Sequence, residues 1–240
     1  MGIIVPAVLP PSRQDLEGKL SRIITLPVSR VQIDVVDGKF TAPASWPFSA
    51  EGGTPELAMM VRGGESLPAL ERIGYEVDLM CLNPERMVGA WIALGASRFT
   101  FHAESLTDIS RVLADAHDRY GRGIVSAGLV SFGLALNIES DLALIESHLN
   151  YVDYVQFMGI ARIGRQGQPF DRRVLEKIRV FRGRHPALPV QVDGGVSLDT
   201  ASELLALGVE SLVVGSALLR SNDPAALVKA FEALRSPFAT

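Results

Sequence analysis

The chain alternates short apolar segments with amphipathic segments, and this alternation continues along its whole 240 residues. Eight segments have the length and the Val and Ile content of buried strands. They are Gly2–Leu9, Arg30–Asp37, Tyr75–Leu82, Arg98–Glu104, Ile124–Leu129, Tyr151–Met158, Pro189–Asp193 and Ser211–Val214. A regular alternation of strands and helices predicts a parallel sheet, and eight units favour a closed barrel over an open doubly wound sheet. We therefore predict an α/β fold, a single (β/α)8 TIM barrel domain over residues 1–240.

The composition narrows the class of partner. With 48% hydrophobic and 21% charged residues, the chain can bury the core of one large soluble domain. A net charge of -4 gives no support for a nucleic-acid or membrane partner. The single cysteine, Cys81, cannot form an internal disulfide and is expected to be a buried apolar residue. We therefore expect a cytoplasmic protein without a membrane-spanning segment.

Acidic side chains lie where several predicted strands end. Asp34 and Asp193 close two Val-rich segments, and Asp193 is followed directly by Gly194 and Gly195. In a closed barrel the carboxyl ends of the strands meet at one mouth, so Asp78 and His102 would face the same site. A single carboxylate at a strand end is equally typical of a helix or loop cap. Several at equivalent positions favour a shared site, in which two acids can donate and accept protons.

Glycines after the last two predicted strands indicate an anion site. Gly194 and Gly195 follow one strand, and Gly215 and Ser216 follow the next. Glycine-rich loops near helix starts can hold phosphate through backbone N–H groups, and barrels commonly place a phosphate site there.

The sequence gives no support for dinucleotide binding or for serine hydrolase chemistry. There is no G-x-G-x-x-G after the first strand for a dinucleotide, and no serine nucleophile elbow for a hydrolase.

Several motifs occur in the order found in one enzyme family. They are DVVDGKF at 34–40, VDLM at 77–80, NPE at 83–85, FHAE at 101–104, GLALN at 133–137, DGG at 193–195 and VGSA at 214–217. This series resembles that of the ribulose-phosphate 3-epimerases and covers essentially the whole chain. The resemblance implies a barrel of the ribulose-phosphate-binding type. It also implies an enzyme that moves a proton at carbon 3 of a ketose phosphate, with a divalent metal over the site.

The resemblance also implies roles for individual residues. The two acid/base aspartates of the family fall on Asp34 and Asp193. One would remove the proton next to the ketone, and the other would protonate the opposite face of the enediolate. The site methionines fall on Met80 and Met158, although a methionine in an apolar strand is more often a core residue. His102 would contact substrate or metal, or would only hold a neighbour through a hydrogen bond.

The metal site departs from the family pattern. The family has histidine where this chain has Gln32 and where it has Asp78, so the metal ligands would be Gln32, Asp34, Asp78 and Asp193. Replacing imidazole with oxygen moves the preference toward magnesium, manganese or calcium and away from zinc, although zinc stays among the candidates. Loss of the metal is the other alternative.

The sequence leaves the reaction open between three hypotheses. The first is an epimerase or isomerase that acts on ribulose-5-phosphate or a related pentulose or hexulose phosphate. The alternatives are a metal-dependent lyase on the same scaffold and a catalytically silent sugar-phosphate-binding protein. A long connection at about 41–65 carries Trp46 and Phe48, which would either close over a sugar or anchor the loop on its own barrel or on a second subunit. We also expect a homo-oligomer.

Overall fold

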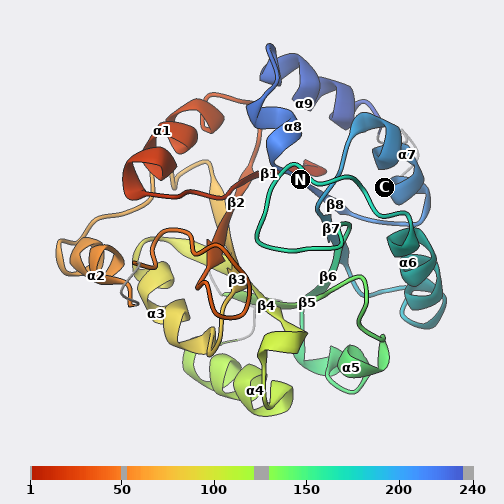
Figure 1. The fold of residues 1–240 in the computed structure, drawn as a ribbon, viewed down its shortest axis with the longest axis horizontal. Helices are drawn as coiled ribbons and strands as arrows, with labels where there is room; N and C mark the ends of the chain where they lie inside the picture. Colours follow the sequence, from red (N-terminus) through yellow and green to blue (C-terminus); the bar gives the residue numbers. More distant parts are fainter. Residues whose placement is uncertain (1, 50–52, 122–129, 235–240) are drawn as a thin grey trace.

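Parallel strands form the centre of the molecule and close into a barrel (Figure 1). The computed structural model describes residues 2–49, 53–121 and 130–234. Within these residues, eight strands pair in sequence order, and β8 returns to pair with β1. The strands are Ile4–Val8 (β1), Arg30–Val36 (β2), Gly74–Met80 (β3), Ala96–His102 (β4), Ser131–Leu136 (β5), Tyr154–Met158 (β6), Val190–Asp193 (β7) and Ser211–Val214 (β8). The predicted TIM barrel is confirmed.

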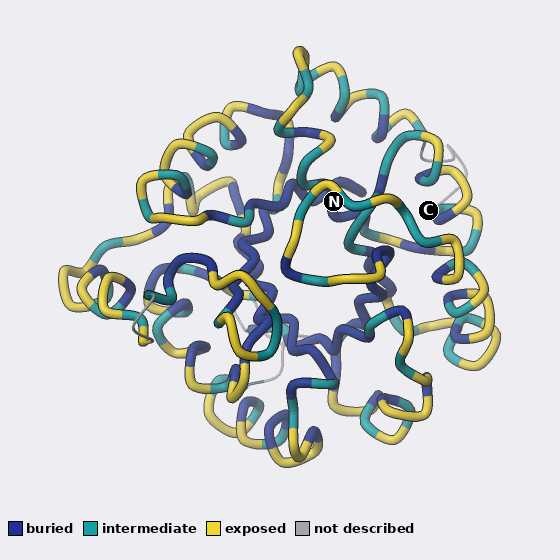
Figure 2. Tube along the Cα trace, in the orientation of Figure 1, coloured by how far each residue is buried: buried dark blue, intermediate teal, exposed yellow. Residues whose placement is uncertain are grey.

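Helices surround the barrel and bury their apolar faces against it (Figures 1 and 2). They are Arg13–Ile23 (α1), Pro55–Arg62 (α2), Glu85–Ala93 (α3), Ile109–Tyr120 (α4), Ala143–Glu146 (α5), Arg173–Arg184 (α6), Leu198–Ala206 (α7), Ser216–Leu219 (α8) and Pro224–Glu232 (α9), with short 3₁₀ turns at Ala103–Ser105 and Leu149–Tyr151. In α4 the buried residues recur with helical spacing. The Asp108 side chain caps the first turn of α4 by accepting from the Arg111 N–H.

The fifth strand lies later in the sequence than predicted. The predicted segment Ile124–Leu129 is outside the described residues, and β5 is Ser131–Leu136. Gly133 lies inside this strand, although glycine ordinarily weakens a strand interior. The barrel needs glycine there. A Cβ atom at Gly133 would lie 2.4 Å from the ring of Tyr154 on the neighbouring β6.

We expect Gly133→Ala to destabilise the protein by about 3 kcal/mol, because the added methyl group overpacks a closed interior. The Tyr154 ring has little freedom to move away, since the Arg98 guanidinium carbon lies 3.2 Å from the ring centroid. Urea unfolding gives the free-energy change. The matched control is Gly183→Ala in α6, where no atom lies within 4 Å of the added Cβ. Equal stability of the two variants would contradict this packing argument.

The connection after β2 is shorter than expected and is held by a buried tryptophan. Helix α2 begins at Pro55, inside the segment 41–65 that we expected to be loop, because proline is well suited to the first turn of a helix. Trp46 is buried, donates from Nε1 to the Glu56 carboxylate at 2.7 Å and packs edge-on against Trp91. Of the alternatives for this aromatic residue, the structure therefore supports an anchor on its own barrel.

Candidate active site

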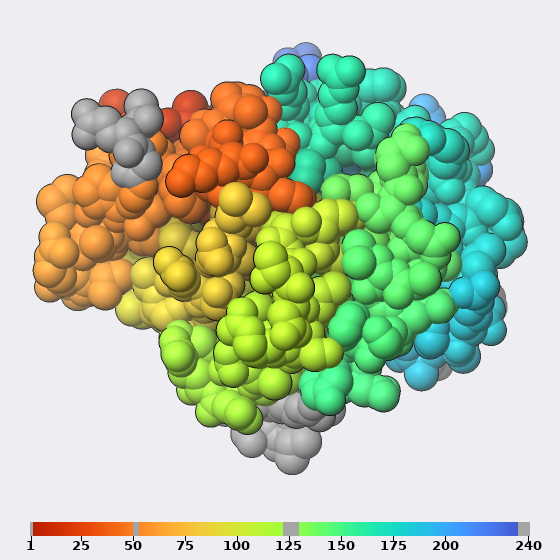
Figure 3. All heavy atoms as spheres, turned by 60° about the horizontal axis from the view of Figure 1, so that its bottom comes forward, coloured from red at the N-terminus to blue at the C-terminus, as the bar shows by residue number. Residues whose placement is uncertain are grey.

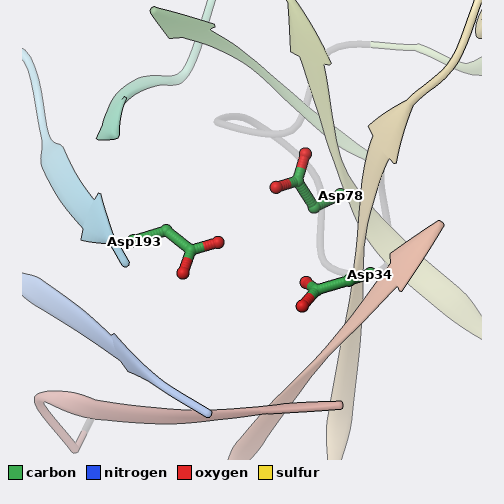
Figure 4. A group of neighbouring side chains, drawn as sticks. All are labelled: Asp34, Asp78 and Asp193. Carbon is green, nitrogen blue, oxygen red and sulfur yellow. The ribbon is translucent and has the colours of Figure 1, made fainter. Parts of the chain in front are cut away.

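Three aspartates from different strands meet at the carboxyl-terminal mouth of the barrel (Figure 4). Asp34 and Asp78 are register partners on β2 and β3, and Asp193 is the last residue of β7. Each offers a carboxylate oxygen, and these oxygens all lie within 4.8 Å of one another. Parallel strands place equivalent residues at the same height in a barrel, which explains why residues far apart in sequence converge here.

A layer of glutamines lies directly beneath the aspartates, and we call Gln32, Gln156 and Gln191 the amide layer. Gln32 precedes Asp34 by two residues, Gln191 precedes Asp193 by two, and Gln156 precedes Met158 by two. Side chains two residues apart point to the same face of a strand, so all three amides enter the barrel interior. They are almost completely buried.

The amide layer donates hydrogen bonds upward to the aspartates. Gln32 Nε2 donates to Asp34 Oδ1 and to Asp193 Oδ2, both at 2.8 Å. Gln156 Nε2 donates to Asp78 Oδ2 at 3.0 Å and lies 3.5 Å from the Met158 sulfur. Each aspartate therefore receives at least one amide donor, which partly compensates the loss of water around a buried carboxylate.

Beside the amide layer lies a buried carboxylate held by two arginines, that of Glu76, which is the register partner of Gln32. Glu76 Oε2 is 3.3 Å from Arg30 Nε and 3.1 Å from Arg98 Nε. Its other oxygen accepts from Gln191 Nε2 at 2.8 Å. We did not predict this network of Glu76, Gln191 and the two arginines from the sequence. The signal was present as a polar residue two positions before each strand-end residue, since such spacing marks the inward face.

His102 lies beside Asp78 and beneath the open part of the site. The ring is fully buried, and its Nε2 is 3.0 Å from Asp78 Oδ1. Burial on its own lowers the pKa of this imidazole, but the charge of Asp78 and the hydrogen bond to it outweigh burial and raise the pKa above its ordinary value. His102 does not line the cavity described below, so its geometry is that of a residue that holds Asp78.

Two carboxyl groups of the cluster, those of Asp34 and Asp193, hold their protons more strongly than isolated aspartates do. Burial, followed by the neighbouring charges of Asp193 and Asp78, raises the pKa of Asp34 well above its ordinary value. Burial and the charge of Asp78 raise the pKa of Asp193 to about 7, and the hydrogen bond from Gln32 only partly opposes this. Near neutral pH the pair therefore contains both a proton to give and a site to accept one.

A cavity of about 230 Å³ opens above the aspartates. Its lining includes Asp34, Asp193, Met80 and Met158 together with the predicted phosphate residues Gly194, Gly195, Gly215 and Ser216. Gly195 has φ +69°, and a Cβ there would lie 2.6 Å from the Phe170 Cα. Glycine is thus required where this loop turns beside the cavity. The cavity also includes Gln166 and Arg220, which the sequence analysis did not select.

Two loops meet over the barrel mouth. The connection between β6 and α6 crosses it in Figure 1, and in the space-filling view of Figure 3 it adjoins the segment after β2. Thr41 Oγ1 donates to the Ile163 carbonyl at 3.0 Å, and Arg165 Nε donates to the Ala42 carbonyl at 3.2 Å. Gln166 Nε2 reaches the Ala7 carbonyl on β1 at 3.4 Å. The crossing loop is thus tied to two other parts of the mouth.

The aspartate cluster fits a divalent cation of the oxygen-preferring class. The three carboxylates offer oxygens within 4.8 Å of one another and repel one another. Burial, together with this repulsion, raises the pKa values of Asp34 and Asp193 when no cation is present. The donors are oxygen atoms, which suit magnesium, manganese or calcium better than zinc. In the described orientation Gln32 presents its nitrogen to this cluster, and its assignment as a ligand stays a prediction.

The sequence matches a family model and several known proteins along most of its length. The model of the ribulose-phosphate 3 epimerase family matches residues 3–219. The chain belongs to this family. A ribulose-phosphate 3-epimerase of Mycobacterium leprae is 31% identical over 204 residues, which cover 83% of this chain and 81% of that protein. The Schizosaccharomyces pombe ribulose-phosphate 3-epimerase is 26% identical over 224 residues, 92% of this chain and 88% of that protein. The expected epimerase or isomerase class is confirmed.

Solved structures of more distant enzymes share the fold of this epimerase family member. The 3-hexulose-6-phosphate synthase of Salmonella typhimurium aligns with TM-score 0.61 and 14% identity over 96% of this chain and 97% of that one. KGPDC from Streptococcus mutans aligns with TM-score 0.65 and 14% identity over 98% and 97%. At this identity the likeness shows the fold alone.

Among the described residues, no helix is both long and apolar enough to cross a membrane.

Proposed function

We propose that this protein is a 3-epimerase of a ketose phosphate, either ribulose-5-phosphate or a related pentulose or hexulose phosphate. The observation that carries the proposal is the arrangement of Asp34 and Asp193. Both line one cavity, both accept from the same Gln32 nitrogen at 2.8 Å, and both have raised pKa values. Two carboxyl groups tuned in this way can act as base and acid near neutral pH.

The proposed reaction transfers one proton off carbon 3 and another onto its opposite face. One aspartate takes the proton beside the ketone, which leaves an enediolate, and the other aspartate delivers its proton from the other side. Met80 and Met158 present apolar surface to the cavity and would exclude water from the reacting carbon. A bound divalent cation, held by Asp34, Asp78 and Asp193, would supply electrostatic stabilisation of the negative charge.

We further propose that the phosphate of the substrate binds at Gly194, Gly195, Gly215 and Ser216. These residues follow β7 and β8 and line the same cavity as the two aspartates. The loops after the last two strands are the common phosphate position in TIM barrels. Arg220 also lines this part of the cavity, and its positive charge favours an anion there.

Proton exchange in deuterated water tests the function. We expect the protein to incorporate deuterium at carbon 3 of ribulose-5-phosphate or a related ketose phosphate and to produce the 3-epimer, as followed by NMR. The reactions are run with magnesium, manganese, calcium or zinc and with a chelator. Unphosphorylated ribulose is the matched control and should react at least about 100-fold more slowly, because phosphate binding contributes to the transition state.

The outcomes of this screen separate the alternatives. A protein that binds sugar phosphates but exchanges no proton with any metal would contradict the epimerase and favour the binding protein. Cleavage of a carbon–carbon bond in place of epimerisation would favour the lyase. Equal rates with and without the phosphate group would contradict the proposed phosphate residues.

A further inference from the structure

The amide layer contacts two kinds of carboxylate, which only accept hydrogen bonds when ionised. The aspartates lie two residues further along the strands, and Glu76 lies at the same level as Gln32. The Glu76 side chain is 1% exposed and is paired with two arginines. Gln191 Nε2 is 2.8 Å from Glu76 Oε1, 2.9 Å from Gln156 Oε1 and 3.2 Å from Gln32 Oε1. Gln191 is therefore the contact that joins the ion-paired carboxylate to both of the other amides.

These contacts favour one orientation of each amide. If the Gln191 amide were turned, its carbonyl oxygen would face the Glu76 carboxylate and two other carbonyl oxygens. With the Gln191 nitrogen in place, Gln32 and Gln156 keep their oxygens toward it and their nitrogens toward the aspartates. Turning Gln32 alone would set its NH₂ group against that of Gln191. The observed orientation leaves Gln191 Oε1 buried without a donor. Turning the amide would instead set this oxygen against the Glu76 carboxylate, which costs more because like partial charges then meet in a buried site.

We propose that Gln191 is a positioning residue that fixes Gln32 as a hydrogen-bond donor to Asp34 and Asp193, and thereby keeps Gln32 from acting as a metal ligand. The cation is then held by Asp34, Asp78 and Asp193, and the amide oxygen of Gln32 takes no part. This inference rests on the proposed function for the role of the aspartates in catalysis, but the amide orientation and its effect on metal affinity are independent of the reaction.

The first experiment measures manganese binding by calorimetry in the wild type and in Gln191→Met. Methionine is close in size and donates no hydrogen bond, so the contact that holds the Gln32 oxygen away from the cation is lost and that oxygen can turn toward the metal. We expect manganese to bind about fivefold more tightly, the effect of about one hydrogen bond. General loosening of the site would weaken binding, so unchanged or weaker binding by a folded variant would overturn the proposal.

The role of Gln32 in the change of manganese affinity is tested in a protein that already carries Gln32→Met. In Gln32→Met no amide oxygen is left to turn, so adding Gln191→Met should leave manganese affinity unchanged. The same fivefold gain in that background would overturn the proposal. Thr100→Val is the matched control, because it removes a buried barrel hydrogen bond, that to Tyr154, and the described hydrogen bonds of Thr100 include none to the amide layer. It should leave manganese affinity as in the wild type.

Turnover gives a separate readout. In Gln191→Met we expect kcat for epimerisation to fall about tenfold, while KM stays within about twofold, because the donors to Asp34 and Asp193 are lost and the phosphate residues are untouched. Gln191→Leu also fills the space without a donor and should lower kcat by the same factor; wild-type kcat in this variant would overturn the proposal. If no proton exchange is found even in the wild type, the proposed function fails while the manganese experiment still decides the orientation.

A measurement on the wild-type protein tests the amide orientation even if the variants do not fold. Neutron diffraction from crystals of the deuterated wild type locates the deuterium atoms on each amide. We expect deuterium on Gln32 Nε2 directed at Asp34 and Asp193, and on Gln191 Nε2 directed at Glu76. Either amide found in the opposite orientation would overturn the proposal.

Discussion

Replacing Asp34 or Asp193 with asparagine is expected to reduce epimerisation at carbon 3 by about 10² to 10⁴-fold in either variant, the usual contribution of a positioned acid or base. Asparagine keeps the size of the side chain and can still accept from Gln32, which donates to both residues. The loss should therefore appear mainly in kcat and leave KM for the ketose phosphate nearly unchanged. NMR detection of each epimer gives both values.

The same variants can identify which face each aspartate serves. Any proton exchange that remains should be confined to one epimer, and to the opposite epimer in the other variant, because each substitution leaves one base intact. Asp199→Asn is the matched control, since Asp199 is an exposed acid in the first turn of α7. Epimerisation that survives at wild-type rate in both active-site variants would refute the two-aspartate mechanism.

We expect Asp193→Asn to stabilise the metal-free protein above neutral pH. A carboxyl group with a pKa of about 7 in the folded state and 3.8 in the unfolded state binds its proton more tightly when folded. Its contribution to stability is complete below pH 3.8 and is lost as the pH rises toward 7. The loss amounts to about 4 kcal/mol at most, and a neutral asparagine does not suffer it.

Urea unfolding with a chelator at pH 5 and at pH 8 measures this effect. The variant should gain stability relative to the wild type as the pH rises between these two values. Added manganese should stabilise the wild type more than the variant, because a cation offsets the repulsion among the carboxylates. A stability difference that is the same at both pH values would show that the Asp193 pKa is not raised.

The barrel could be predicted because apolar strand segments and amphipathic helix segments alternate regularly along the sequence. Seven of the predicted strands overlap the observed ones, since buried parallel strands are short apolar segments bounded by polar residues. The fifth was misplaced, because Gly133 weakens the local strand signal in Ser131–Leu136. The reason for that glycine is the Tyr154 ring on the next strand, which is a contact that only the closed barrel creates.

The aspartates were predictable for a related reason, but the network beneath them was not. Strand ends meet at one mouth in any parallel barrel, so Asp34, Asp78 and Asp193 could be grouped from their positions alone. The sequence position of a glutamine within a strand predicts only which face of the sheet its side chain occupies. The direction of its amide depends on partners from other strands, such as Glu76 for Gln191, and no local pattern contains that information.

The hydrogen bonds that join the two loops over the barrel mouth lie apart from the residues proposed to transfer protons. Thr41 and Arg165 bind backbone carbonyl groups across the two loops, and neither hydrogen bond includes the acid/base aspartates. Residues of the crossing loop line the cavity, so we expect these hydrogen bonds to affect ligand residence time rather than the proton-transfer barrier. Relatives with the same aspartates but different loops would then differ in throughput, and this surface could be redesigned while the barrel interior is left intact.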